Sequence, residues 1–177
     1  MSSFKGSKTE NNLKEAFSGE SQARNRYTYF ASIAKKEGYE AIGAIFLEIA
    51  DQEKEHAKLE FKYLNGLGNT EENLQSAING ENYEWTNMYD KFAKEAKEEG
   101  FTEISNLFQG LAKIEKNHEQ IFQQLLDLIK NKKMFADDKI VIWKCRNCGN
   151  IVLAKEAPLE CDVCKHPRSY FQKMGNA

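Results

Sequence analysis

An internal repeat constrains the fold of this chain more than any other sequence feature. The segments AKKEGYEAIGAIF (34–46) and AKEEGFTEISNLF (96–108) are offset by 62 residues. The same offset relates four further pairs: Tyr27 and Tyr89, Phe30 and Phe92, Glu53 and Glu115, and His56 and His118. Glu20 and Glu81 miss this offset by one residue. Two similar halves packed together predict a pseudo-symmetric structure in which matched residues face each other.

Apolar residues recur at steps of three and four through both halves, as an amphipathic helix requires. The chain therefore predicts a mainly α four-helix bundle within residues 1–135, with helices over residues 9–37, 40–64, 80–98 and 102–131. Gly38 and Gly100 fall between consecutive helices, where a left-handed residue ends a helix. We expect Thr102 to cap the fourth helix.

The polar segment 65–80 predicts the longer connection between two helical hairpins. A segment of this length reaches about 50 Å when extended, which exceeds the ~35 Å length of the bundle. A ferritin-like crossover, with the second and third helices parallel, is therefore allowed. A simple up-and-down arrangement is allowed as well.

Ionisable residues on the inward stripes carry the chemistry. Five glutamates and two histidines lie there: Glu20, Glu53, Glu81, Glu84, Glu115, His56 and His118. Ionised carboxylates in a core are very costly unless they are paired or bind metal. No Lys or Arg lies near them on the same stripes, and Arg24 and Arg26 cannot neutralise five acids. Bound metal cations would neutralise these carboxylates.

The spacing of these residues suits a metal pair. Both histidines belong to Glu-x-x-His motifs, which place two ligands on one helix face. One such motif alone is more often a surface feature, but here two recur at the repeat offset. Two motifs plus a Glu from each of two other helices match the di-metal carboxylate pattern of helical bundles. The oxygen-rich ligand set favours iron or manganese over zinc.

Other polar residues of the bundle need a separate interpretation. We expect four further glutamates to be solvated: Glu48, Glu55, Glu60 and Glu119. Tyr27 and Tyr89 lie about two helical turns beyond Glu20 and Glu81 on the same faces. Each is either a core tyrosine or a hydrogen-bond donor to a ligating carboxylate.

A second metal site is expected within residues 136–177, where four cysteines form two Cys-x-x-Cys pairs: Cys145, Cys148, Cys161 and Cys164. This spacing predicts a tetrahedral four-thiolate site, which Trp143, Tyr170 and Phe171 would cover. We expect His166, which lies beside a complete ligand set, not to bind the metal. Spacing alone does not separate structural zinc from electron-carrying iron, and the redox-capable bundle favours iron.

Composition excludes several classes of partner. The net charge of −2 gives no reason to expect nucleic acid or an anionic membrane. No segment approaches the ~20 apolar residues of a membrane span, and the N-terminus has no apolar core of a secretion signal. Without an export signal, paired cysteines indicate metal ligands rather than disulfides.

Five segments together resemble the rubrerythrin family: GESQARNRY (19–27), DQEKEHAK (51–58), GENYEWTNMY (80–89), IEKNHE (114–119) and WKCRNCG (143–149). The similarity covers nearly the whole chain. It implies a ferritin-like di-iron bundle followed by a C-terminal rubredoxin-like domain. It also implies a cytoplasmic homodimer that reduces hydrogen peroxide to water and protects an anaerobic or microaerophilic prokaryote from oxidative stress.

The resemblance assigns the site residues by position: Glu53 and Glu115 bridge two irons, Glu20 and Glu81 bind terminally, His56 and His118 are the imidazole ligands, Glu84 is an additional carboxylate, and Cys145, Cys148, Cys161 and Cys164 hold a third iron as an FeS4 centre. We add Tyr27 and Tyr89 to the catalytic set. The family's electrons come from NAD(P)H through a flavoprotein reductase, often with a separate rubredoxin. The 65–80 connection is short for the family, so the hairpins belong to one subunit or are exchanged in a dimer.

Two rival functions follow from parts of the pattern. A ferroxidase or iron-storage protein needs the same bundle but no tethered electron carrier, so the cysteine domain argues against it. A helical scaffold with a zinc ribbon for protein contacts leaves the buried glutamates without a purpose.

Overall fold

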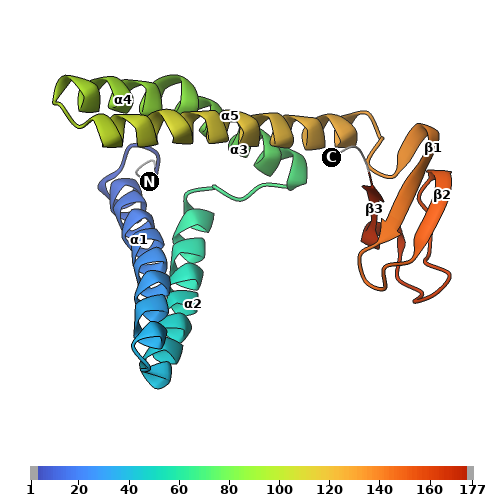
Figure 1. The fold of residues 1–177 in the computed structure, drawn as a ribbon, viewed down its shortest axis with the longest axis horizontal. Helices are drawn as coiled ribbons and strands as arrows, with labels where there is room; N and C mark the ends of the chain where they lie inside the picture. Colours follow the sequence, from blue (N-terminus) through green and yellow to red (C-terminus); the bar gives the residue numbers. More distant parts are fainter. Residues whose placement is uncertain (1–3, 175–177) are drawn as a thin grey trace. The chain divides into compact units, whose positions relative to one another are not determined.

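A computed structural model describes residues 4–174, which fall into two compact units that divide between Asn69 and Thr70. The predicted fold class is confirmed, because a mostly helical chain is followed by a small strand domain with four cysteines (Figure 1). Within the described residues no helix is long and apolar enough to cross a lipid bilayer.

The first unit is an antiparallel helical hairpin. It consists of α1 (Lys8–Lys36) and α2 (Glu40–Tyr63). The Ser7 side chain accepts a hydrogen bond from the Glu10 backbone N–H and so caps the start of α1. Gly38 has a φ of 87° in the tight turn between the helices, as the sequence predicts.

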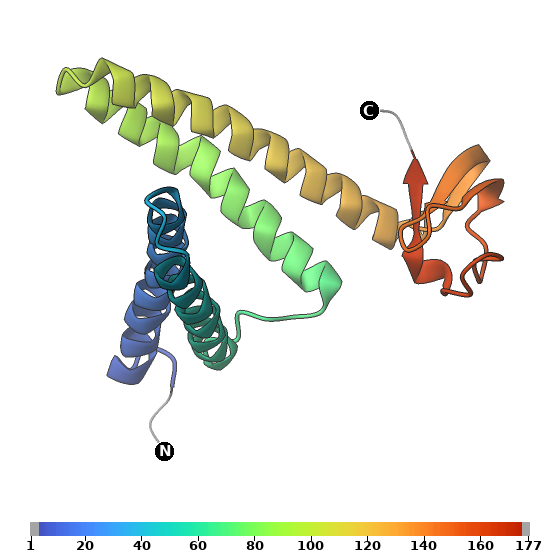
Figure 2. The same cartoon turned by 60° about the horizontal axis from the view of Figure 1, so that its bottom comes forward.

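The second unit begins with a long helical rod. The rod consists of α3 (Thr70–Tyr83), the π-helical segment η1 (Glu84–Met88) and α4 (Tyr89–Glu98), and it packs along α5 (Thr102–Lys130) in Figure 2. The buried Ser105 hydroxyl ties α5 to α4 by donating to the Ala93 carbonyl at 2.7 Å. Gly100, with a φ of 87°, makes the turn between α4 and α5.

Two details of the predicted helices are wrong. The third helix begins at Thr70 rather than residue 80, so the connection between the hairpins is residues 64–69. Glu71 and Glu72 in the first turn favour this earlier start through the helix dipole. Thr102 does not cap α5 with its side chain, because it is already the first helical residue.

The π-helical segment explains the one-residue mismatch in the repeat. Glu20 and Tyr27 are seven residues apart, whereas Glu81 and Tyr89 are eight apart. A π-helical turn accommodates an extra residue in an otherwise α-helical segment, and η1 lies between Glu81 and Tyr89. The extra residue is therefore absorbed without moving either residue to another face of the rod.

The C-terminal part of the second unit is a three-stranded antiparallel sheet. Its strands are β1 (Ala136–Cys145), β2 (Ile151–Glu156) and β3 (Phe171–Met174), in the order β2-β1-β3, and a 3₁₀ turn η2 (Arg168–Tyr170) leads into β3. Trp143 and Phe171 are buried against Cys145 and Cys161, as predicted. Tyr170 is exposed instead, with its ring edge against His166 at a centroid distance of 4.4 Å.

Candidate metal centres

The first hairpin brings three of the predicted ligands together. Glu20 from α1 and Glu53 and His56 from α2 each offer a ligand atom, and these atoms lie within 4.8 Å of one another. His56 Nδ1 lies 2.8 Å from Glu53 Oε2 and 3.8 Å from Glu20 Oε1. The Glu-x-x-His spacing therefore aims an imidazole and a carboxylate at the same point, as it predicts.

The second unit repeats this arrangement. Glu81 from α3 and Glu115 and His118 from α5 form an equivalent group within 4.8 Å. His118 Nδ1 lies 2.6 Å from Glu115 Oε2 and 3.6 Å from Glu81 Oε2. We call the group of Glu20, Glu53 and His56 half-site A, and the group of Glu81, Glu115 and His118 half-site B.

Each half-site crowds two acids together. The pKa of Glu20 is raised by burial and then by the negative charge of Glu53. The pKa of Glu81 is raised by burial and then by the charge of Glu115. In the described part of the chain, the ion-pair partners of these carboxylates are His56 and His118. A cation bound between the acids would remove the repulsion, and mixed oxygen and imidazole ligands fit iron.

Glu84 lies near half-site B but outside its three-ligand group. It is the first residue of η1 and is half-buried. Its charge contributes to raising the pKa of Glu81, after burial and the effect of Glu115. The structure thus places this predicted ligand close enough to act on the half-site electrostatically.

Matched aromatic residues lie beyond both half-sites. In the first unit Tyr27 packs against Phe30 and Phe46, with centroid distances of 6.3 and 6.1 Å. In the second unit the residues at the repeat offset, Tyr89, Phe92 and Phe108, pack the same way, with Tyr89 5.9 Å from Phe108. The pKa of Tyr89 is raised by burial and then by the charge of Glu84. Its phenol therefore stays protonated at neutral pH and keeps a hydrogen-bond donor.

Two of the glutamates expected to be solvated are not. Glu119, which follows His118 on α5, is half-buried and accepts hydrogen bonds from Asn82 Nδ2 at 3.0 Å and Trp85 Nε1 at 2.5 Å. Glu60 is half-buried, and its Oε2 is buried without a hydrogen-bond partner. Glu48 and Glu55 are exposed, as predicted.

Sequence reasoning also missed the donors to Glu119. Asn82 and Trp85 lie on either side of the start of η1, and Lys116 places its Nζ 5.0 Å from the centre of the Trp85 ring. Such contacts join residues of different helices and leave no periodic signal in the sequence. The available signal was the one-residue mismatch of Glu81, which marks a local departure from α-helical geometry.

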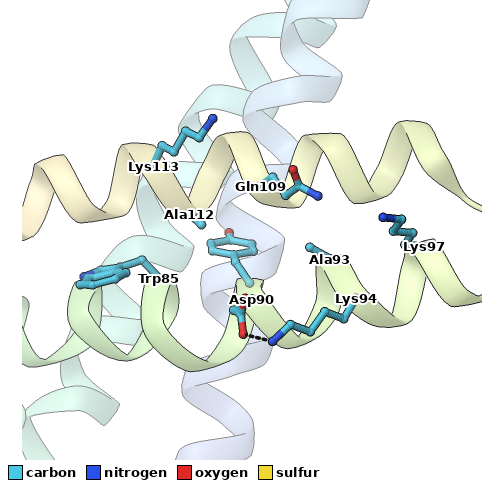
Figure 3. A pocket seen from close by; sticks show the side chains of 9 residues that line it. Trp85, Asp90, Ala93, Lys94, Lys97, Gln109, Ala112 and Lys113 are labelled. Carbon is cyan, nitrogen blue, oxygen red and sulfur yellow. Dashed lines mark hydrogen bonds and ion pairs between the residues drawn. The ribbon is translucent and has the colours of Figure 1, made fainter.

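A cavity of about 400 Å³ lies in the groove between α4 and α5, and Trp85 and Tyr89 contribute to its lining. Figure 3 shows Lys94 and Lys97 from the rod and Gln109 and Lys113 from α5 around it, with Lys94 paired to Asp90 at 2.7 Å. The lining does not include the residues of half-site B. The cavity therefore borders the tyrosine beyond half-site B but not the three-ligand group itself.

All four cysteines meet in the small sheet domain. Their sulfurs lie within 4.8 Å of one another, with Cys145 and Cys164 3.7 Å apart and Cys148 and Cys161 3.6 Å apart. The residue after each pair, Gly149 or Lys165, has a left-handed φ of 80° or 60°. The backbone N–H of each then reaches back to the carbonyl of the first cysteine of its pair.

The four thiols share protons unequally. The backbone N–H of His166 lowers the pKa of Cys164 to about 6. The backbone N–H of Asn150 acts to lower the pKa of Cys148, yet desolvation and the neighbouring thiols raise it to about 12. A cation that holds all four sulfurs as thiolates removes this competition. His166 points its Nδ1 at the Cys164 carbonyl, 3.1 Å away, and lies outside the four-sulfur group.

Two family models match this chain. The family model described as rubrerythrin matches residues 11–126, and the model described as the rubrerythrin rubredoxin-like domain matches residues 143–172. The chain belongs to the rubrerythrin family. Rubrerythrins of Porphyromonas gingivalis and Nitratidesulfovibrio vulgaris are 49% and 43% identical to it, over 97% and 99% of this chain and 92% and 98% of theirs. Rubrerythrin-1 of Clostridium acetobutylicum is 47% identical over 97% of each chain.

Membership of the rubrerythrin family makes the chain an oxidoreductase and accounts for its cofactors. The Glu and His groups provide a di-iron carboxylate site, and the four cysteines provide a rubredoxin-like site. The acids, imidazoles and thiols present fit these metals.

Proposed function

We propose that this rubrerythrin is a peroxidase that reduces hydrogen peroxide to water with electrons passed through its four-cysteine iron. The observation that carries the proposal is the presence, in one chain, of paired Glu and His ligand groups and a four-thiol group. A ferroxidase or iron-storage protein uses the Glu and His groups and has no need of the four-thiol group. A zinc-ribbon scaffold uses the four-thiol group and gives no role to the crowded carboxylates of the two half-sites.

The proposed reaction takes up two electrons and two protons for each peroxide and releases two waters. Iron held by the half-sites would supply the two electrons and would polarise the O–O bond. Glu53 and Glu115 would bridge the metals, Glu20 and Glu81 would bind them terminally, and His56 and His118 would complete the ligand set. The carboxylates would balance the positive charge of the metals in this partly buried site.

We assign hydrogen-bonding and proton-relay roles to three residues outside the two half-sites. The raised pKa of Tyr89 keeps its phenol protonated, so it can donate a hydrogen bond that orients groups near Glu84, Glu115 and Glu81, whose charges act on it. We assign Tyr27 the equivalent role at half-site A. Glu84, as an additional carboxylate, would orient or relay a proton to the departing oxygen.

The last part of the proposal concerns the domains and the donor that deliver electrons to the di-iron site. We propose a division into a di-iron domain, residues 1–135, and an FeS4 domain, residues 136–177, with Cys145, Cys148, Cys161 and Cys164 as the third iron's ligands. An NAD(P)H-dependent flavoprotein reductase, with or without a separate rubredoxin, would reduce the FeS4 centre. The protein would work as a homodimer in the cytoplasm and protect the cell from peroxide.

The test is an anaerobic assay of iron-loaded protein with NAD(P)H, a rubredoxin reductase and hydrogen peroxide. NAD(P)H oxidation should depend on peroxide and match peroxide consumption one to one, without release of dioxygen. Ferric iron should not accumulate in the protein as a mineral. Iron uptake that continues to many ions per chain, with negligible peroxide turnover, would support the storage function instead.

A further inference from the structure

Glu60 is a half-buried acid that the proposed reaction does not use. It lies in α2, and one of its carboxylate oxygens, Oε2, is buried with no hydrogen-bond partner among the described residues. A buried carboxylate oxygen without a donor costs free energy, because it has lost its contact with water and gained no hydrogen bond in exchange. This oxygen therefore needs a partner that the described side chains do not supply.

The repeat shows that packing does not require an acid at this position. The residue at the offset of 62 from Glu60 is Phe122 in α5, which is also half-buried. An apolar side chain therefore fills the equivalent place in the second unit. The first unit thus has a carboxylate where its repeat has apolar surface, and the reason for the acid must be specific to the first unit.

Helix geometry directs Glu60 toward half-site A. Glu60 follows His56 by four residues and Glu53 by seven, and both spacings place it on the helix face that carries these ligands. Helical side chains lean toward the N-terminus of their helix, which directs the Glu60 carboxylate toward the turn of His56. The pKa of Glu20, which is raised first by burial and then by Glu53, is raised further by the charge of Glu60. The Glu60 carboxylate is therefore close enough to act on half-site A.

Each half-site consequently has one further acid beside its three-ligand group. Glu84 acts on the terminal glutamate of half-site B, as Glu60 acts on that of half-site A. The two further acids are not repeat partners, because the residue three positions after Glu20, where Glu84 stands after Glu81, is Ala23. The further acid comes from the Glu-x-x-His helix in half-site A and from the other helix in half-site B.

We propose that Glu60 is a fourth cation-binding residue of half-site A, whose carboxylate helps to hold the metal bound by Glu20, Glu53 and His56. The inference rests on the metal-binding carboxylate site of the proposed function and adds a residue to it. A bound cation gives the buried oxygen the partner that it lacks and offsets its repulsion with Glu20. In the metal-free protein the same carboxylate destabilises the fold. Removing it should therefore have opposite effects on metal affinity and on the stability of the metal-free chain.

Manganese binding to the metal-free, full-length chain is the first test. Mn²⁺ prefers carboxylate ligands to thiolates, and the electron paramagnetic resonance signal of free Mn²⁺ reports how much is bound. Glu60→Gln and Glu60→Leu should each weaken the binding of one of the two ions in the carboxylate site by about tenfold or more, the usual effect of losing a group that supports a metal site. Glu55→Gln removes the same charge from an exposed position on α2 and should bind Mn²⁺ like wild type.

Urea unfolding of the metal-free proteins at neutral pH is the second test. Glu60→Leu should unfold at a higher urea concentration than wild type, because it removes a buried carboxylate oxygen without a partner. A midpoint below that of wild type would show that Glu60 has a structural partner and would overturn the proposal. Wild-type Mn²⁺ affinity in both Glu60 variants would overturn it as well. Neither measurement uses peroxide, so failure of the peroxidase proposal leaves both results interpretable.

Discussion

Trp85 Nε1 donates a hydrogen bond to Glu119 Oε2 at 2.5 Å, which ties the π-helical segment to the residue after His118. Asn82 donates to the other oxygen of the same carboxylate at 3.0 Å. The two donors lie on either side of Glu84, so Glu119 holds the backbone that carries this carboxylate. A π-helical turn is rare in proteins, and these two hydrogen bonds tie it to α5.

Replacing Trp85 by Phe should loosen η1 without emptying half-site B. The substitution removes a hydrogen bond to a charged acceptor, a loss of roughly 1.5–3 kcal/mol. Hydrogen exchange of the amides in residues 84–88 should become about tenfold faster or more, as mass spectrometry of the metal-free protein can measure. Tyr83→Phe, at a position that is 59% exposed, is the matched control. Equal exchange in wild type and the Trp85 variant contradicts the assigned role of Glu119.

Glu84→Ala should separate metal binding from turnover. Glu84 lies outside the three-ligand group of half-site B, so iron stoichiometry should stay close to wild type. Peroxide turnover should fall by about tenfold or more, the usual effect of losing a group that positions or relays a proton. The exposed Glu95→Ala on α4 serves as the control. Loss of iron from the Glu84 variant, or unchanged turnover, contradicts this assignment.

Cys148→Ser should abolish electron entry and leave the carboxylate site intact. Three thiolates and a hydroxyl no longer provide the tetrahedral sulfur set, so the charge-transfer absorption of the FeS4 centre should disappear. Turnover driven by NAD(P)H and a reductase should fall to background, while iron bound by the Glu and His residues remains. His166→Ala alters a neighbour outside the four-sulfur group and should keep the colour. Normal turnover in the Cys148 variant would contradict this role and would indicate that the four-cysteine site is structural.

The metal-free protein should become less stable as pH rises above the ordinary glutamate pKa of 4.5. Glu20 and Glu81 have raised pKa values in the folded protein. Between pH 4.5 and those raised values, the folded state therefore binds more protons than the unfolded state. The free energy of unfolding therefore decreases with increasing pH. A variant with Glu20→Gln and Glu81→Gln should lose this part of the pH dependence in urea unfolding curves, whereas Glu48→Gln should retain it. Identical curves for all three proteins count against the electrostatic account.

Helix positions were largely predictable from sequence because apolar spacing and two turn glycines determine them. Gly38 and Gly100 adopt the left-handed conformation expected of them. The start of α3 was missed because a polar segment with a glycine near its end resembles a loop. Tertiary contacts override that composition, since Ile78 in the same segment is buried.

The ligand groups were also predictable, because Glu-x-x-His spacing is a property of the helix itself. The partners of Glu119 were not, because Asn82 and Trp85 approach it from another helix and a hydrogen bond between helices leaves no periodic pattern. The exposure of Tyr170 was missed for a similar reason. Its ring packs against His166 rather than over the sulfurs, and Tyr170 ends η2 just where Phe171 begins β3.

Anaerobic stopped-flow spectroscopy of the fully reduced protein tests the central claim most directly. On mixing with limiting hydrogen peroxide, the absorption of the oxidised four-thiolate iron should return as peroxide is consumed, with no release of dioxygen. A variant with Glu53→Ala and Glu115→Ala, which keeps all four cysteines, should show no such rapid return. Return of the absorption at the wild-type rate in that variant would contradict the account, because peroxide would then be reacting without the carboxylate centre.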